Sequence, residues 1–481
     1  MNRQAAFDMD AEEFRRLGHS VVDWMADYVA GIRDRRVTEG ESPRQVRAAL
    51  GDAPLADEGM EAGAVLARAW KLLSEHSLHN GHPRFAGYVI SSPAPVGALA
   101  DLIASTLNAN CGAWLLSPMA AEMELQAIGW IAEFIGYPAG CGGLLVSGGN
   151  MANFAGVVAA RRAMANWDVR SEGMRDGRLR IYASREIHTW LQKAADLLGF
   201  GTASIRWVED VGELKPRIRQ DREAGDQPFL IAASAGTVSR GAVDPLRELA
   251  VIARGEGLWL HVDGAYGAPA AGLEDAHPDL KALAEADSLA LDPHKWFYTP
   301  VEAGCVLVRD RKHLPAAFDY SPLYYRFTAD EEEQPVNFYT MGPQNSRGFR
   351  ALKVWVAMQT AGRDGLRRMI AGDIALAAAL YEEIGRHPEL EALTLGLSVV
   401  TFRYLPKEGA DVDEVNRDLL DRLQKGGEVF LSNAIVDGRF ALRACFVNFR
   451  TTMDDVGAIV ETVVRYGREA ASRQPYVRMK G

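Results

Sequence analysis

Short apolar runs alternate with amphipathic stretches between about residues 142 and 309. The apolar runs have strand length and cover residues 143–147, 180–183, 204–208, 229–233, 258–262, 288–291 and 304–308. Most are separated by stretches with helical periodicity, among them residues 150–166, 188–198, 245–254 and 280–285. This alternation is typical of an α/β domain in which helices cover both faces of a mainly parallel sheet, here of seven strands. Ligands of such sheets bind at the carboxyl ends of the strands.

A separate apolar stripe lies near the start of the chain. Its residues recur at helical spacing: Phe14, Leu17, Val21, Val22, Met25, Tyr28, Val29 and Ile32. The stripe predicts an amphipathic helix whose apolar face must dock on the main body or on a partner subunit. The polar, interrupted residues 33–54 are predicted to be a connector, and residues 60–75 a further helix.

The last third of the chain changes pattern. Residues 319–342 form an irregular segment longer than most loops, which is typical of a lid or of disorder. Helices are predicted at residues 350–362 and 366–385, followed by a strand (398–404), a helix (412–424), a hairpin (429–449) and a helix (454–470). We therefore expect an N-terminal helical segment (1–80), a large α/β domain (81–360) and a small α+β domain (361–481).

Charge and cysteine content restrict the environment. The net charge is −11 with no basic block, which argues against nucleic acid or an anionic membrane as partner. Residues 102–121 and 134–160 carry no charge, but their Ser, Asn, Pro and clustered Gly favour a buried core or a dimer interface over a membrane span. Cys111, Cys141, Cys305 and Cys445 form no C-x-x-C pair. Without a secretory leader in the first ten residues, a cytoplasmic chain is expected.

Two strand ends carry residues suited to a flat anionic ligand. Ser147, Gly148, Gly149 and Asn150 lie between a strand and a helix, where backbone N–H groups can bind phosphate, although such turns are often only structural. Asp263 ends another apolar run, and a buried aspartate needs a cation or hydrogen bonds. The small Gly264 and Ala265 after it leave room for a ring.

Lys295 follows a third strand, within Asp292-Pro293-His294-Lys295-Trp296. An amine in apolar surroundings loses proton affinity and becomes a nucleophile, whereas the alternative is an ordinary surface lysine. His188 opens a predicted helix after the strand 180–183, and it too has an ordinary polar interpretation. His76, His79 and His82 could suggest a metal site, but Asn80-Gly81 and Pro83 break any helix that would align them. No metal is predicted; a loop at a substrate pocket is the preferred interpretation.

An amine, an anion site and a carboxylate on one sheet edge match the needs of pyridoxal 5'-phosphate. The cofactor's aldehyde takes the amine, its phosphate takes the anion site, and the carboxylate keeps its ring nitrogen protonated.

The motifs then resemble those of the group II pyridoxal-phosphate decarboxylases, most closely the aromatic L-amino-acid decarboxylases. The resemblance covers almost the whole length and rests on Glu13-Phe14-Arg15, His82-Pro83-Arg84-Phe85, Ser117-Pro118, Glu122-Met123-Glu124, the segment from Ser147 to Asn153, His261-Val262-Asp263-Gly264-Ala265-Tyr266 and Asp292-Pro293-His294-Lys295-Trp296. It implies the fold-type I, aspartate-aminotransferase-like fold. It also implies a homodimer with shared active sites, in which residues 1–80 wrap over the partner subunit.

The resemblance implies a role for each site residue. Lys295 would form the Schiff base, Asp263 would pair with the pyridinium, and His188 and Ala265 would flank the ring. Phosphate contacts would come from Gly149, Asn150, Ser288 and His294, with Thr237 near the ring hydroxyl. The Cα carbanion left by CO2 would be protonated by Tyr324, with Tyr325 as the neighbouring candidate. At Asn150 and Met151 the chain departs from the family's usual phosphate turn.

The expected reaction is decarboxylation of an aromatic L-amino acid to its amine, through an external aldimine and a quinonoid. Phe85, Tyr88 and Trp114 would make the substrate pocket aromatic and apolar. Four alternatives stay open: a decarboxylase of an acidic or other amino acid, an oxidative aldehyde synthase, a transaminase, and an inactive regulatory protein that binds the cofactor.

Overall fold

The computed structural model describes residues 5–175, 178–321, 335–407 and 410–473. Its N-terminal part consists of α1 (Ala11–Ala30), the short η1 (Ile32–Asp34), α2 (Pro43–Leu50) and α3 (Ala62–Glu75). The prediction that residues 33–54 are a plain connector is wrong, because α2 lies within them. Ser42 and Gln45 form a capping box there, and Pro43 occupies the first turn, where its missing N–H costs nothing.

The N-terminal part is anchored to the C-terminal part of the same chain. Arg33 lies 2.9 Å from the buried carboxylate of Asp455, and the backbone N–H of Val37 donates to Gly427. On α1, however, Leu17 is buried while Phe14, Val22 and Val29 are exposed. Much of the predicted stripe therefore remains uncovered by this chain.

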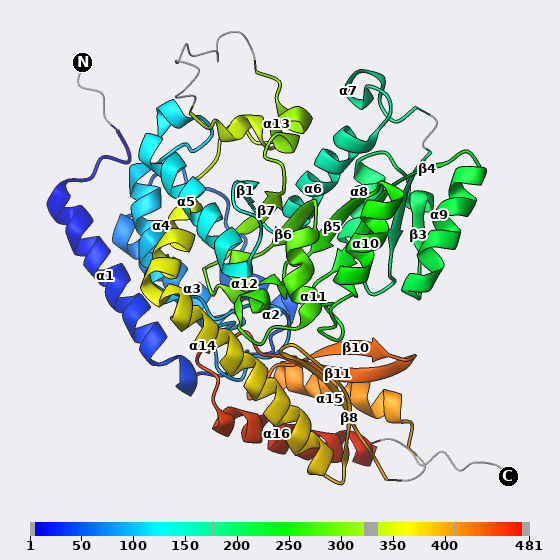
Figure 1. Cartoon of the computed structure of the whole chain (residues 1–481). Helices are drawn as coiled ribbons and strands as arrows, with labels where there is room; N and C mark the ends of the chain where they lie inside the picture. The colour runs from blue at the N-terminus through cyan, green and yellow to red at the C-terminus, as the bar shows by residue number, and fades with distance from the viewer. Residues whose placement is uncertain (1–4, 176–177, 322–334, 408–409, 474–481) are drawn as a thin grey trace.

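The large sheet has the predicted seven strands and is mainly parallel (Figure 1). They are β1 (Gly142–Val146), β2 (Leu179–Ala183), β3 (Ile205–Trp207), β4 (Gln227–Ser234), β5 (Trp259–Asp263), β6 (Ser288–Leu291) and β7 (Gly304–Val308). Their order is β1-β7-β6-β5-β4-β2-β3, and β7 alone runs against its neighbours β1 and β6. Since β1, β5 and β6 are buried along their whole length, their near-continuous apolar sequences are explained.

Helices cover both faces of this sheet, some by packing on its strands and others by packing on those helices (Figure 1). Those of four residues or more are α4 (Pro95–Leu107), α5 (Pro118–Ile135), α6 (Gly149–Met164), α7 (Val169–Glu172), α8 (Trp190–Leu197), α9 (Leu214–Glu223), α10 (Leu246–Glu256), η5 (Ala268–Gly272), α11 (Pro278–Lys281), η6 (Ala282–Glu285), α12 (Pro293–Trp296) and α13 (His313–Phe318). Shorter turns are η2 (Trp114–Leu116), η3 (Thr202–Ser204), η4 (Val211–Glu213) and η9 (Phe338–Thr340). Among the described residues, no helix is long and apolar enough to cross a membrane.

The C-terminal part has its own sheet and its own core. Its elements are α14 (Ala351–Arg386), β8 (Leu390–Gly396), β9 (Val399–Tyr404), α15 (Val412–Gly426), β10 (Ser432–Val436), β11 (Arg439–Cys445) and α16 (Met453–Arg473), with strand order β10-β11-β9-β8. All three pairings are antiparallel. The two helices expected at 350–362 and 366–385 lie within α14, which is interrupted at Gly362 (φ +63°). The sequence pattern missed β8, whose side chains are only partly buried.

Candidate active site

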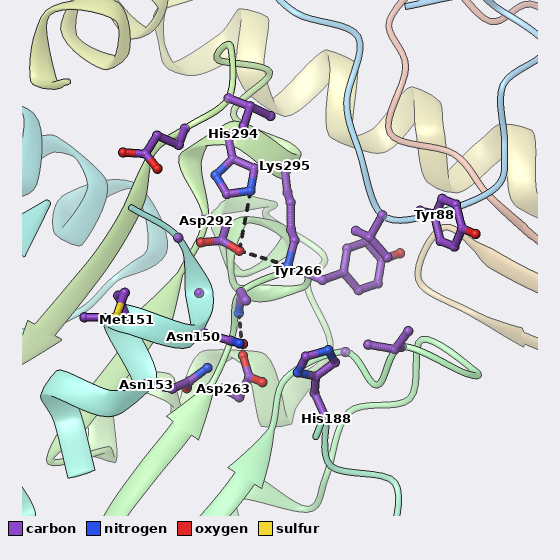
Figure 2. Close-up of a pocket in the computed structure, with 18 of the residues that line it drawn as sticks. Tyr88, Asn150, Met151, Asn153, His188, Asp263, Tyr266, Asp292, His294 and Lys295 are labelled. Carbon is purple, nitrogen blue, oxygen red and sulfur yellow. Dashed lines mark hydrogen bonds and ion pairs between the residues drawn. The ribbon is translucent and has the colours of Figure 1, made fainter. Parts of the chain in front are cut away.

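A cavity of about 490 Å³ lies at the carboxyl edge of the large sheet (Figure 2). Its wall combines the start of α6, the end of β5, the segment leading into α12, and β11 of the C-terminal sheet. Eight of the predicted site residues line it: Tyr88, Gly149, Asn150, His188, Asp263, Ala265, His294 and Lys295. Parallel strands bring these residues together because their carboxyl ends meet at one edge.

The turn before α6 packs so closely against its neighbours that they leave no room for a Cβ atom. A Cβ on Gly149 would lie 2.8 Å from Oδ2 of Asp292 and 3.1 Å from Cβ of Ala265. A Cβ on Gly304 would likewise lie 2.5 Å from the backbone of Gly148. Glycine is thus needed here for space, and the first N–H groups of α6 face the cavity without partners inside the helix. This arrangement favours an anion.

Lys295 lies in α12 with its Nζ 2.9 Å from Oδ2 of Asp292 (Figure 2). Burial on its own lowers the pKa of Lys295, but the carboxylates of Asp292 and Asp263 raise it, and the net pKa is above that of an ordinary lysine. The expectation that apolar surroundings lower the proton affinity of this amine is therefore wrong. Nearby negative charge outweighs desolvation, so the amine is held as an ammonium.

Asp263 is the last residue of β5 and is largely buried. Its Oδ1 accepts a hydrogen bond from the backbone N–H of Ala265 at 3.1 Å. Burial raises the pKa of Asp263 above its usual range, while Lys295 opposes the rise. A carboxylate in such a place gains most from a cation that shares its burial.

Two histidines complete the wall. His188 precedes α8, which begins at Trp190 and not at residue 188 as predicted. The ring Nδ1 of His188 accepts the backbone N–H of Trp190 at 3.2 Å, and burial lowers the pKa of His188. Its ring points into the cavity in Figure 2. His294 lies opposite, with Nδ1 2.6 Å from the carbonyl oxygen of Ala303 and Nε2 3.8 Å from Asp292.

Ser288 is not brought to the cavity, which corrects its assignment as a phosphate ligand. It begins β6 whereas the cavity lies beyond the end of that strand, and its hydroxyl is fully buried against Trp259 and His261. Thr237 is buried with its hydroxyl accepting the N–H of Ala242, although its neighbours Gly236 and Val238 line the cavity.

Two of the three aromatic substrate residues also lie apart from the cavity wall of this chain. Phe85 is buried and stacks on Phe430 at 5.4 Å between ring centroids. Trp114 donates from its indole N–H to Glu122 at 2.8 Å and is only partly buried. Tyr88 alone contributes directly. Tyr324 and Tyr325 lie outside the described residues.

Among the wall residues that the sequence analysis did not assign to the site are Asp292 and Arg443. Asp292 directly follows β6 and precedes Lys295 by three residues. This spacing places two side chains side by side in a helical turn, so the contact was predictable from the sequence. Arg443 on β11 donates to the carbonyl oxygens of Gly87 and Val238, each at 2.7 Å. No local signal pointed to Arg443, because both carbonyls lie more than two hundred residues away in the sequence.

The three clustered histidines have separate partners. His76 lies 2.9 Å from Glu41, and His79 shares a hydrogen bond with the hydroxyl of Tyr28. Nδ1 of His82 accepts the backbone N–H of Arg84. Within the described parts of the chain, no group of three or more His, Cys, Asp or Glu side chains could hold a metal ion.

The residues around the cavity fit pyridoxal phosphate. The glycine turn leaves the start of α6 open to a phosphate, Lys295 supplies the amine, and Asp263 supplies the carboxylate for a protonated ring nitrogen. The volume of about 490 Å³ is within the range of small-molecule sites. One feature opposes the phosphate: Oδ2 of Asp292 faces the same turn, and Oδ1 of this carboxylate is buried with no hydrogen-bond partner among the described residues.

Comparison with known proteins gives a consistent picture. Residues 43–405 match the model of the pyridoxal-dependent decarboxylase conserved domain. An aromatic-L-amino-acid decarboxylase of Bacillus atrophaeus is 34% identical over 98% of each chain, and a phenylacetaldehyde synthase of Arabidopsis thaliana is 29% identical over 90% of this chain and 92% of its own. The crystal structure of Oryza sativa TDC with PLP and tryptamine superposes with a TM-score of 0.89 at 28% identity, covering 97% of this chain and 99% of that one.

Proposed function

The chain belongs to the pyridoxal-dependent decarboxylase family, and we propose on that premise that it converts an aromatic L-amino acid to the corresponding amine and CO2. Membership makes it a carboxy-lyase that depends on pyridoxal phosphate. The observation that carries the proposal is the cavity on which Lys295, Asp263 and the start of α6 converge.

Bound pyridoxal phosphate supplies an electron-accepting ring that stabilises the negative charge left at Cα when CO2 departs. We propose that Lys295 holds the cofactor covalently and that Asp263 holds the proton at its ring nitrogen. The burial of Asp263 supports this role, because a buried carboxylate retains a cationic partner strongly.

The remaining site residues would hold the phosphate of the cofactor and orient its ring. The proposed phosphate contacts are Gly149 and Asn150, which begin α6, and His294, which lines the same cavity. His188 and Ala265 line the cavity beside Asp263 and are proposed to flank the ring. Because Nδ1 of His188 is an acceptor for the N–H of Trp190, its Nε2 carries a proton and can donate to an anionic substrate group.

The choice of an aromatic substrate rests on the similarity to the Bacillus atrophaeus enzyme and on the cavity wall. Tyr88, Tyr266 and Val238 form its apolar side. We further propose that Phe85 and Trp114 act in the substrate site of the assembled dimer, since Trp114 is partly exposed on this chain.

Arg443 favours a second candidate, decarboxylation of an acidic amino acid. A guanidinium at the wall of the cavity can bind a substrate carboxylate. However, two of its nitrogens already donate to the carbonyl oxygens of Gly87 and Val238, which lowers its capacity for a second carboxylate.

The test is CO2 release from a panel of amino acids: phenylalanine, tyrosine, tryptophan, glutamate and aspartate. We expect kcat/KM for at least one aromatic substrate to exceed that for both acidic ones by about a hundredfold or more, because a substrate carboxylate left unpaired against the apolar wall costs about 3 kcal/mol or more. Preference for glutamate or aspartate would support the second candidate. Turnover of an α-keto acid would instead indicate a transaminase.

Tyr324 is the proposed donor of the proton to Cα, on the basis of the motif resemblance. Tyr324→Phe should slow amine release and, with dissolved O2 as the oxidant, raise the yield of aldehyde, ammonia and peroxide with any accepted substrate. Both products can be measured in one assay, by chromatography for the amine and by coupled oxidation for peroxide. Tyr325→Phe is the matched control. Unchanged amine production by Tyr324→Phe would contradict the assignment of Tyr324 as the proton donor.

We propose a homodimer in which residues 1–80 wrap the partner subunit, with the large domain at 81–360 and the small domain at 361–481. It is supported by the exposed apolar residues of α4: Leu99, Leu102, Ile103 and Leu107. Ile103→Asp combined with Leu107→Asp should convert dimer to monomer in sedimentation experiments, because burying the new carboxylates is unfavourable. Val251→Asp, an exposed apolar position on α10, should leave the mass unchanged. A wild-type monomer at micromolar concentration would contradict the proposal.

A further inference from the structure

A chain of hydrogen bonds runs through the interior behind Asp263. The indole Nε1 of Trp259 lies 2.8 Å from Oγ of Ser288, and the same Oγ lies 2.7 Å from Nδ1 of His261. On its other side, Nε2 of His261 lies 2.8 Å from Oδ1 of Asn153. His261, Ser288 and Asn153 are at most 1% exposed, so water does not compete for these groups.

The acceptor at one end fixes the direction of the whole chain. Oδ1 of Asn153 can only accept, so Nε2 of His261 carries a proton and donates to it. The imidazole is neutral, since burial lowers the pKa of His261 to about 3. Its Nδ1 therefore carries no proton and accepts from the hydroxyl of Ser288, whose oxygen accepts from the indole N–H of Trp259. The NH2 group of Asn153 is left as a donor.

The position of Asn153 points this donor at the cavity. Asn153 lines the cavity, whereas His261 and Ser288 lie behind it. His261 and Asp263 are two residues apart on β5, so their side chains share the face of the sheet that meets α6. A Cβ on Gly156 of α6 would lie 2.6 Å from the His261 ring, which explains a glycine inside a helix, where it is destabilising. In Figure 2 the amide nitrogen of Asn153 points toward Asp263.

We propose that Asn153 is a positioning residue for Asp263: its NH2 group, oriented by His261 and Ser288, stabilises the charged form of that carboxylate. The effect opposes the burial that favours the neutral acid. The inference rests on the proposed role of Asp263 in holding the protonated ring nitrogen of the cofactor. It gives Ser288 a place in the enzyme through His261 and Asn153 in place of direct phosphate contact.

The experiment compares two cofactors on the full-length protein stripped of cofactor. One is pyridoxal phosphate, and the other is its 1-deaza analogue, in which carbon replaces the ring nitrogen. Asn153→Leu should weaken binding of pyridoxal phosphate by about tenfold, because the charged, buried carboxylate of Asp263 loses an amide group directed at it, and leave binding of the analogue unchanged. Dissociation constants come from absorbance titration and need no turnover. Ser288→Ala should change binding in the same sense by a smaller factor, and it tests the inference if Asn153→Leu does not fold.

Asp263→Asn is the reference variant. If the proposed role of Asp263 holds, this variant also discriminates between the two cofactors. Equal weakening of both cofactors by Asn153→Leu and Ser288→Ala, or no weakening, would overturn the inference while Asp263→Asn still discriminates. If Asp263→Asn fails to discriminate as well, the proposed role of Asp263 fails and the inference fails with it.

Discussion

Two buried ion pairs near the large sheet differ in how completely their polar atoms are hydrogen-bonded. Glu124 and Arg347 lie 2.5 Å apart with exposures of 0% and 1%. Glu124 also accepts the N–H of Leu145, and Arg347 also donates to the carbonyl oxygens of Cys111 and Leu145. Asp292 and Lys295 lie 2.9 Å apart, but the lysine is 22% exposed to the cavity and Oδ1 of Asp292 has no partner in the described chain.

The difference suggests a structural role for the Glu124–Arg347 pair and a functional role for the Asp292–Lys295 pair. Arg347 donates to both carboxylate oxygens of Glu124, and this bidentate geometry holds the two side chains in one arrangement. The pair connects α5 and β1 to the segment before α14. A pair with an unused acceptor and an accessible amine can exchange partners. A buried ion pair alone therefore does not indicate an active site, whereas an incomplete pair on a cavity marks a candidate one.

Lys295→Ala tests the incomplete pair at its strongest point. We expect the absorbance band of lysine-bound cofactor to disappear and kcat/KM to fall by at least about a thousandfold, as for loss of a covalent group. Lys281→Ala is a matched control, because that amine donates to the carbonyl oxygens of Ala271 and Leu273 and, among the described residues, to no carboxylate. Retention of the band in Lys295→Ala would remove the basis of the comparison.

Glu124→Gln tests the complete pair. Removal of one charge leaves Arg347 buried without its counter-ion, which costs about 3–5 kcal/mol of unfolding free energy. We expect a lower denaturation midpoint in urea, while the folded fraction keeps the wavelength and pH dependence of the cofactor band. A change in the band without a change in stability would place Glu124 in the chemistry instead.

Asp292→Asn tests the link between the Asp292 carboxylate and the amine. That carboxylate raises the pKa of Lys295, so its removal lowers this pKa, and the neutral amine appears at a lower pH. The pH profile for capture of the cofactor by Lys295 should shift to lower pH, measured as the rate at which the absorbance band appears. Loss of a negative group facing the phosphate should also tighten cofactor binding about tenfold.

Glu302→Gln is the control for this variant, since Glu302 also lines the cavity but lies 3.2 Å from Arg350 and is not paired with Lys295. It should leave the pH profile in place. An unshifted profile in Asp292→Asn would show that Asp292 does not govern the charge of Lys295.

Much of the fold followed from the sequence because its signals are local. Alternating apolar runs and amphipathic stretches located all seven strands of the large sheet, and the change of pattern after residue 319 preceded the elements of the second, four-stranded sheet. β8 was missed because its half-buried residues lack a strong alternation, and α2 because its apolar content is low. The lysine, the aspartate and the glycine turn were singled out because each lies at or just after the end of a strand that the sequence pattern shows.

The sequence by itself determined the element types, the sheet edge that carries the chemistry and the family motifs, since these depend on neighbours within a few residues. The tertiary structure decided the electrostatics. It placed two carboxylates beside Lys295, raising a pKa that was expected to fall. It also placed Ser288, a predicted phosphate contact, in the interior behind Asp263, and it placed Arg443, which belongs to the C-terminal sheet, on the cavity wall. Charge and desolvation act through space, so residues far apart in the chain set them together.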